Sequence, residues 1–111
     1  MYYTFFYQQS ALVDCDFTYE ERDLQSLELK WYFRHDPKPI YTWVPPAAPQ
    51  VDQTFKNHIN ANYEISSDPH LKHRALNLRG LSTKLSGRYS CRVSSIHNDI
   101  FESKDFIIYC K

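Results

Sequence analysis

The chain has 111 residues, which is enough for one domain and too few for two. Its 13 basic residues balance 13 acidic ones, so net charge gives no support for attraction to nucleic acid or to an anionic membrane. Only 2 glycines occur, which excludes a glycine-rich phosphate loop, and no apolar run approaches the ~18 residues of a membrane span.

The first eight residues, MYYTFFYQ, lack the basic start and the continuous apolar stretch of a secretory signal. One hypothesis is that residues 1–8 are partly a gene-model artefact, because Tyr, Phe and Thr codons can be pyrimidine-rich. A run ending in Gln8 is then what a translated splice-acceptor tract would look like. The alternative is an ordinary first strand, and a transcript that reads through these codons would decide for it. We place the domain at residues 9–110, and expect it to be one domain of a longer protein.

Alternation of apolar and polar residues predicts strands in the first half of the chain. Segment 11–17 is apolar at every second position, and 27–34 repeats the pattern after a charged break. Segment 36–39 predicts a turn, because its prolines fix φ and remove backbone donors. A short strand at 40–44 then ends at Pro45 and Pro46.

The second half is irregular before it returns to strands. Within 47–62 we expect at most a strand near 51–55, and 63–65 is a second weak candidate. Stronger strand patterns follow at 75–78, 88–94 and 101–109, with a turn at Asn98 and Asp99. No segment longer than about ten residues has a helical period, so the chain is predicted to be all-β.

Three residues carry most of the information about the fold: Cys15, Trp31 and Cys91. A cysteine on an early strand, a tryptophan on the next and a late cysteine are typical of immunoglobulin-like sandwiches. In these a disulfide crosses between two sheets and the indole fills the space beside it. Tyr89 stands two residues before Cys91, where a tyrosine corner binds an upstream backbone group. We predict a Cys15–Cys91 disulfide with a core pin of Trp31 and Tyr89.

The distance between the two cysteines indicates the subtype. Cys15 and Cys91 are 76 residues apart, which at one turn every ~8–12 residues leaves room for roughly six to eight strand-to-strand steps. Between the two strands that carry the cysteines, a variable-type domain needs six such steps and a constant-type domain needs four. We therefore predict a variable-type sandwich of about nine strands in two packed antiparallel sheets. Such a disulfide is worth ~4.5 kcal/mol in the chain-entropy model and implies an oxidising compartment.

One alternative stays open for the two core cysteines. It is a cytosolic sandwich in which Cys15 and Cys91 are reduced core residues. A separate question concerns Cys110, which has no partner in the predicted disulfide. It is an unpaired thiol, or it pairs with another chain or with a cysteine outside this sequence.

Three stretches resemble the first immunoglobulin domain of the beaten-path family, arthropod neural recognition proteins. They are LKWY at 29–32, IYTWVP at 40–45 and LSGRYSCRVS at 85–94. The resemblance runs from about residue 9 to residue 109. Leu85 stands where many variable-type domains have Asp, a departure that the family shares. Arg92 and the turn at 98–101 fit the family less well.

The resemblance implies a secreted or membrane-attached protein with tandem immunoglobulin domains. It would bind sidestep-type immunoglobulin receptors on another cell during axon guidance and synaptic matching. The predicted mechanism is heterophilic protein binding, through an exposed sheet face or the loops at one end. The alternatives are a soluble immune-type binder of foreign ligands and an intracellular structural sandwich.

Alternation also suggests which residues face a partner. The candidate partner-binding residues are Lys30, Tyr32, Arg34, Tyr41, Trp43 and Arg92. Ser90 and Ser94 are placed on the same outward face. Tyr, Trp and Arg are enriched at interface hot spots. The alternative for Tyr41 and Trp43 is that they pack inward or against the loop at 45–49.

Other chemistry finds little support in the sequence. His70 and His73 could approach each other, but no further ligand at zinc-site spacing completes a metal site. The acidic residues Asp16, Glu20 and Glu21 are more typical of a solvated loop than of a general acid–base pair. We therefore expect no enzyme activity, cofactor, metal, small-molecule substrate or nucleic acid, and no membrane insertion by this domain itself.

Overall fold

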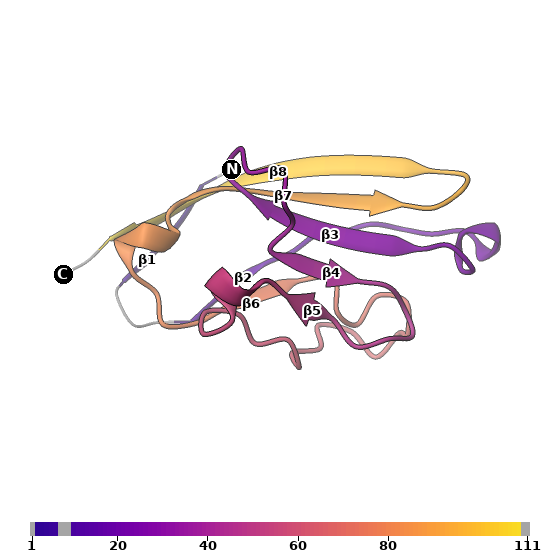
Figure 1. Cartoon of the computed structure of the whole chain (residues 1–111), viewed down its shortest axis with the longest axis horizontal. Coiled ribbons are helices and arrows are strands. Elements are labelled where there is room, and N and C mark those ends of the chain that lie inside the picture. Colours follow the sequence, from indigo (N-terminus) through magenta and orange to yellow (C-terminus); the bar gives the residue numbers. More distant parts are fainter. Residues whose placement is uncertain (1, 7–9, 110–111) are drawn as a thin grey trace.

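The computed structural model describes residues 2–6 and 10–109, which form eight strands and three short 3-10 helices (Figure 1). The strands are β1 (Tyr2–Phe6), β2 (Ala11–Val13), β3 (Glu28–Phe33), β4 (Tyr41–Trp43), β5 (Gln50–Val51), β6 (Leu76–Leu78), β7 (Gly87–Ser94) and β8 (Asp99–Tyr109). The 3-10 helices are η1 (Glu21–Asp23), η2 (Gln53–Phe55) and η3 (Thr83–Leu85). Within the described ranges, no helix is both long and apolar enough to cross a membrane.

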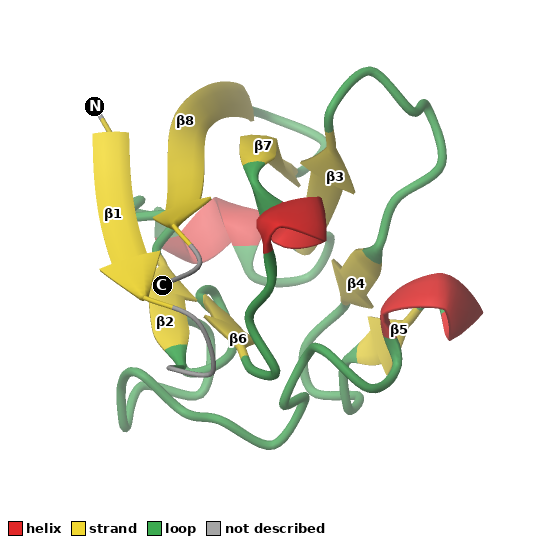
Figure 2. Cartoon of the chain, turned by 90° about the vertical axis from the view of Figure 1, so that its left-hand side faces the viewer, coloured by secondary structure: helices red, strands yellow, loops and turns green. Residues whose placement is uncertain are grey.

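The strands form two sheets. One has six strands in the order β1-β8-β7-β3-β4-β5, and the other is the pair β2-β6. All pairings are antiparallel except that of β1 with β8, which is parallel. Viewed end-on, the large sheet curves over the small pair, and the core lies between them (Figure 2). The predicted all-β architecture of two packed sheets is confirmed.

The strand count differs from the expected value of about nine. Between β5 and β6 the described chain makes an isolated bridge, Ile59 with Leu78, rather than a strand. Of the expected strand at 51–55 only Val51 is in a strand, as the end of β5, because Asp52 accepts hydrogen bonds from the amide and hydroxyl of Thr54 and starts η2. The expected strand at 63–65 is a loop.

The start of the chain contributes to the large sheet. β1 pairs with β8, with Tyr2 opposite Asp105 and Phe6 opposite Tyr109. Residues 2–6 therefore adopt an ordinary first strand. The hypothesis of a gene-model artefact stays a prediction that a transcript would test. The predicted boundaries at residues 9 and 110, and with them Cys110, lie outside the described residues.

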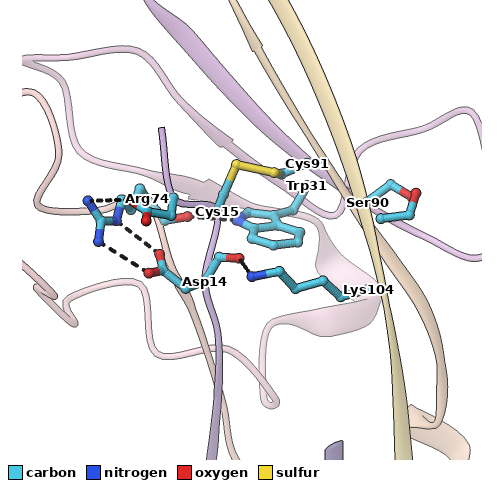
Figure 3. The surroundings of a disulfide bond; sticks show 9 residues. Asp14, Cys15, Trp31, Arg74, Ser90, Cys91 and Lys104 are labelled. Carbon is cyan, nitrogen blue, oxygen red and sulfur yellow. Dashed lines mark hydrogen bonds and ion pairs between the residues drawn. A yellow bond between two sulfur atoms is a disulfide. The ribbon is translucent and has the colours of Figure 1, made fainter. Parts of the chain in front are cut away.

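The centre of the sandwich is the Cys15–Cys91 disulfide, which joins the segment after β2 to β7 with a Cα–Cα distance of 6.2 Å. The predicted pin residues lie beside it, and both are fully buried. The Trp31 indole Nε1 donates to the carbonyl of Arg74 at 2.9 Å (Figure 3). The Tyr89 hydroxyl donates to the carbonyl of Leu85 at 2.7 Å, which is the geometry of a tyrosine corner.

An ion pair covers one side of this core. The Arg74 guanidinium holds the Asp14 carboxylate through both oxygens, at 2.9 and 3.2 Å. The Lys104 ammonium, from β8, donates to the backbone carbonyl of the same aspartate (Figure 3). The end of β2, the approach to β6 and strand β8 are thereby joined beside the disulfide.

Candidate recognition surface

The two faces of the large sheet differ because successive side chains of a strand point to opposite sides. On β3 and β7 the inner residues are buried: Leu29, Trp31, Tyr89, Cys91 and Val93. The outer residues of the same strands include Lys30, Tyr32, Arg88 and Arg92. This outer face is the place to look for a functional site, because its polar groups are not needed to form the core.

The prediction that Tyr41 and Trp43 face a partner is wrong. Their side chains are only 2% and 1% exposed. The reason is the register of β4, which pairs Tyr41 with Trp31 and Trp43 with Leu29. Directly paired residues share a face of the sheet, so both aromatics join the core. There the Tyr41 hydroxyl donates to the His73 carbonyl at 2.7 Å, and Trp43 meets the His73 ring edge-on.

A hollow of about 350 Å³ opens on the outer face across β3, β7 and β8. Its lining residues are Tyr32, Arg34, His35, Asp36, Arg88, Ser90, Arg92, Phe101 and Ser103. We call this feature the outer hollow. It brings together three of the residues predicted from sequence, Tyr32, Arg34 and Arg92. Lys30 lies on the same face but not in the lining, and its ammonium pairs with Glu28 at 2.9 Å.

Sequence reasoning missed several lining residues, of which Arg88 follows from alternation and Phe101 from strand register. Arg88 precedes Ser90 by two positions on β7 and therefore shares its face. Phe101 lies opposite Arg92 across the β7–β8 pair and is 64% exposed. The signal for Arg88 is therefore present in the sequence, whereas Phe101 can be placed only once the register of β8 against β7 is known.

The floor of the outer hollow is a pair of serine hydroxyls. Ser90 faces outward as predicted, but it is only 5% exposed because it lies at the bottom of the hollow. Its Oγ lies 2.8 Å from the Oγ of Ser103, its cross-strand neighbour. In such a pair one hydroxyl donates to the other, so one O–H remains free to donate elsewhere.

Two arginines of the outer hollow are fixed by two-point ion pairs. Arg92 contacts Asp99 through Nε at 3.0 Å and Nη2 at 2.8 Å. Arg88 contacts Asp105 in the same way, at 3.0 and 3.4 Å. The hydrogen bond with Asp99 raises the pKa of Arg92, and the arginine hydrogen bonds lower the pKa values of both aspartates. These pairs orient the guanidinium planes at the rim.

Arg34 is held differently. Its φ is 58°, a left-handed conformation that is uncommon for residues other than glycine. Its amide donates to the Arg88 carbonyl at 2.7 Å, and Nη2 donates to the Ser86 carbonyl at 3.2 Å. The guanidinium carbon lies 4.7 Å from the centre of the Phe33 ring. In the described part of the chain, the contacts of this guanidinium are thus a carbonyl and an aromatic ring rather than a carboxylate.

Gly87 makes room for Arg34. A Cβ at this position would lie 3.0 Å from a ring carbon of Phe33 and 3.2 Å from Nε of Arg34. Its φ of 153° is also one that other residues rarely adopt. The glycine therefore allows the arginine side chain to lie across the start of β7.

A second cluster joins two loops at one end of the molecule. Asp23, in η1, is only 3% exposed. Its carboxylate accepts from the Ser95 hydroxyl at 2.6 Å, the Glu20 amide at 2.9 Å and the Asn98 side-chain amide at 3.1 Å. These hydrogen bonds, first of all that from Ser95, lower the pKa of Asp23 to about 2. The sequence analysis placed this residue only in a charged break.

His70 and His73 contact different groups. His73 is buried and its Nδ1 lies 2.9 Å from the Tyr63 carbonyl, while Nδ1 of His70 is 3.9 Å from a carboxylate oxygen of Asp68. In the described ranges, Cys15, Cys91 and Glu102 are the group close enough to share an ion. The two sulfurs are bonded to each other, so neither is available as a thiolate ligand.

Comparison with known proteins identifies the fold. No family model matches the sequence, and no curated protein matches it. Among solved structures, the amphioxus IgVJ-C2 molecule superposes with a TM-score of 0.67 at 15% identity. The chain has the immunoglobulin fold. The match covers 96% of this chain and 54% of the amphioxus chain, so this immunoglobulin-like domain spans about half the length of that neighbour.

The immunoglobulin fold does not by itself assign a function. In all, 848 chains of solved structures match, and a fold this widespread serves many unrelated functions. The surface residues of the domain, rather than its fold, therefore determine its function.

Proposed function

We propose that this domain is a recognition module that binds a protein partner through the outer face of β3, β7 and β8. The observation that carries the proposal is the outer hollow, which gathers Arg34, Arg88 and Arg92 with two aromatic rings. Arg and Tyr are residue types enriched at interface hot spots. The ion pairs of Arg88 and Arg92 hold this surface in one geometry, which lowers the entropy lost on binding.

The proposal extends to the subtype and the family. β4 and β5 continue the large sheet beyond β3, in the place where variable-type domains have two additional strands. The three stretches that resemble the beaten-path family form β3, β4 and β7 with their flanks. Membership would make the domain extracellular, as part of a secreted or membrane-attached protein. Its partners would be sidestep-type receptors in axon guidance, and the disulfide is typical of such an oxidising location.

The test is a binding assay with the oxidised domain against a panel of cell-surface immunoglobulin ectodomains, sidestep-type ones included. We expect a specific hit that Arg92→Glu weakens at least tenfold, because the substitution puts a second carboxylate beside Asp99 and reverses the charge of this position on the binding face. Arg79→Glu is the matched control, since Arg79 is an exposed arginine that follows β6 on the other sheet.

Three results would contradict the proposal. No hit in the panel would contradict the partner class and favour a soluble immune-type binder. An equal loss with Arg79→Glu would contradict the assignment of the face. Three free thiols in the native protein, in place of one, would contradict the extracellular assignment and favour an intracellular structural sandwich.

A further inference from the structure

We propose that the outer hollow receives a carboxylate side chain of the partner, an Asp or Glu with an apolar residue next to it. The inference rests on the proposed function and names the chemistry that this face recognises. It follows from what the hollow leaves unsatisfied after its internal contacts are made.

The rim contains one guanidinium that is not neutralised by a neighbouring acid. Arg88 and Arg92 are paired through two hydrogen bonds each, with Asp105 and Asp99. Arg34 instead donates Nη2 to a backbone carbonyl and rests on the ring of Phe33. A guanidinium has five N–H donors in a fork that matches a carboxylate. Arg34 therefore retains both the charge and the donors that such a group requires.

The lining also contains one acidic residue, whose negative charge opposes the positive charge of Arg34. Asp36 lies two positions after Arg34, and its Oδ1 accepts from the backbone amide of Lys38 at 2.9 Å. This hydrogen bond holds the Asp36 carboxylate within its own turn. The other lining groups that can carry charge are Arg88, Arg92 and His35.

The backbone of Arg34 supports a binding role. Left-handed residues other than glycine are strained, and such strain is concentrated at ligand clamps and active sites. Here it is maintained by the amide hydrogen bond to Arg88 and by the space that Gly87 leaves. The arrangement fixes the guanidinium at the rim, whereas a flexible surface arginine would sample many positions.

The floor supplies a second donor. Ser90 and Ser103 share one hydrogen bond, which uses the hydrogen of one hydroxyl and leaves that of the other free to donate. Ser90 is only 5% exposed, whereas Ser103 is exposed. The remaining O–H is available to an occupant of the hollow that accepts a hydrogen bond. An acceptor that is also anionic satisfies the rim and the floor together.

The aromatic rings that line the hollow favour an occupant with an apolar neighbour, as an acidic residue of a protein chain has. Tyr32 and Phe101 also line the hollow, and Phe101 is exposed over 64% of its surface. An apolar residue beside the acid would cover these rings. The volume of about 350 Å³ is at the lower end of the ~300–1,000 Å³ of small-molecule sites and suits a side chain with part of its neighbour.

The test uses two probes that differ only in charge, N-acetyl-Glu-Leu-amide and N-acetyl-Gln-Leu-amide. Each is titrated into the ¹⁵N-labelled, oxidised full chain, and backbone amide shifts are followed by NMR. We expect the glutamate probe to shift the amides of Arg34, Ser90 and Ser103, with an affinity about tenfold above that of the glutamine probe. Equal affinities, shifts elsewhere only, or no glutamate-specific shift would overturn the proposal.

Variants separate the two donors from general effects on folding. Arg34→Asn removes the guanidinium but keeps a residue that tolerates positive φ, and Ser90→Ala with Ser103→Ala removes the floor hydroxyls. Both should reduce glutamate binding, the first at least tenfold, while Arg79→Gln should leave it unchanged. A glutamate response that survives both variants would overturn the proposal. Unchanged unfolding midpoints show that the variants are folded.

The same variants distinguish this inference from the proposed function. A partner whose binding is weakened by Arg92→Glu but not by Arg34→Asn supports the recognition face and overturns the carboxylate occupant. A glutamate-specific response without any protein partner in the panel supports the occupant chemistry and contradicts the proposed partner class.

Discussion

The inner and outer faces of β3 and β7 are built from alternate residues of the same strands, yet they are stabilised in different ways. On the inner face Trp31, Tyr89 and Cys91 are buried and their polar groups are satisfied or bonded. On the outer face Arg88 and Arg92 are half exposed and form ion pairs with β8. Burial contributes most of the stability of a domain, whereas exposed ion pairs contribute little. The outer pairs therefore matter chiefly for the shape and charge of the surface.

Neighbouring substitutions at positions 31 and 32 give the largest expected contrast. Trp31→Ala should lower the free energy of unfolding by about 3–5 kcal/mol, because it leaves a cavity beside the disulfide and removes the hydrogen bond to Arg74. Tyr32→Ala, on the outer face, should cost about 1 kcal/mol or less. Denaturant unfolding of both variants tests this. Similar costs would contradict the assignment of the two faces.

Gly87→Ala tests the contact between the two faces. The added Cβ would meet Phe33 at 3.0 Å and Arg34 at 3.2 Å, and the backbone would be strained. We expect a loss of about 1–3 kcal/mol and displacement of Arg34, measured by denaturant unfolding and by the amide shift of residue 34. Lys84→Ala, at an exposed position of η3, is the control. A stable variant with an unmoved Arg34 would show that the glycine is not required.

Asp23→Asn should change how stability depends on pH. The folded pKa of about 2 lies below the usual value of about 3.9, so the carboxylate stabilises the fold above pH ~4. This contribution is lost as the pH falls through about 2. The unfolding midpoint of the variant should therefore decline less than that of the native chain between pH 4 and 2.

Some acid sensitivity should remain in that variant. Asp52 also has a pKa of about 2, lowered by the hydrogen bond from the Thr54 hydroxyl and by that from Lys38. Asp16→Asn, on an exposed residue, serves as the control. If Asp23→Asn and Asp16→Asn gave the same acid profile, the loop cluster would not be a source of acid sensitivity.

Arg92→Ala is expected to have the smallest effect on folding. Both members of its ion pair with Asp99 are about half exposed, and such pairs contribute little to stability. The thermal unfolding midpoint should therefore hardly change, while binding to a partner of the outer face should weaken. A large drop in the midpoint would place this pair with the structural residues of the inner face.

The core could be predicted from sequence because its signals are redundant. Cys15, Trp31 and Cys91 each fit the same sandwich, and alternation places Leu29 and Val93 on the same side. These inferences need only the residue order within a strand, and β3 and β7 are long enough to show it.

The outer site was only partly predictable because it depends on how strands are paired. The face of Tyr41 and Trp43 is decided by the register of β4 against β3, which a three-residue strand does not reveal. Phe101 joins the hollow through the register of β8 against β7. Asp23 is hydrogen-bonded to Ser95 and Asn98, which are more than seventy residues away in the sequence. No local sequence pattern predicts these hydrogen bonds.

The Asp23 cluster has a consequence for engineering and for sequence drift. Because one carboxylate holds Ser95 and Asn98, the η1 loop and the β7–β8 turn are a single unit rather than two independent loops. A library that changes Asp23, Ser95 or Asn98 alone would break this unit. Diversity is better placed at Ile96, which is 83% exposed, and at its neighbour His97, with the three hydrogen-bonded residues retained. Homologous chains should accordingly exchange these three residues together or not at all.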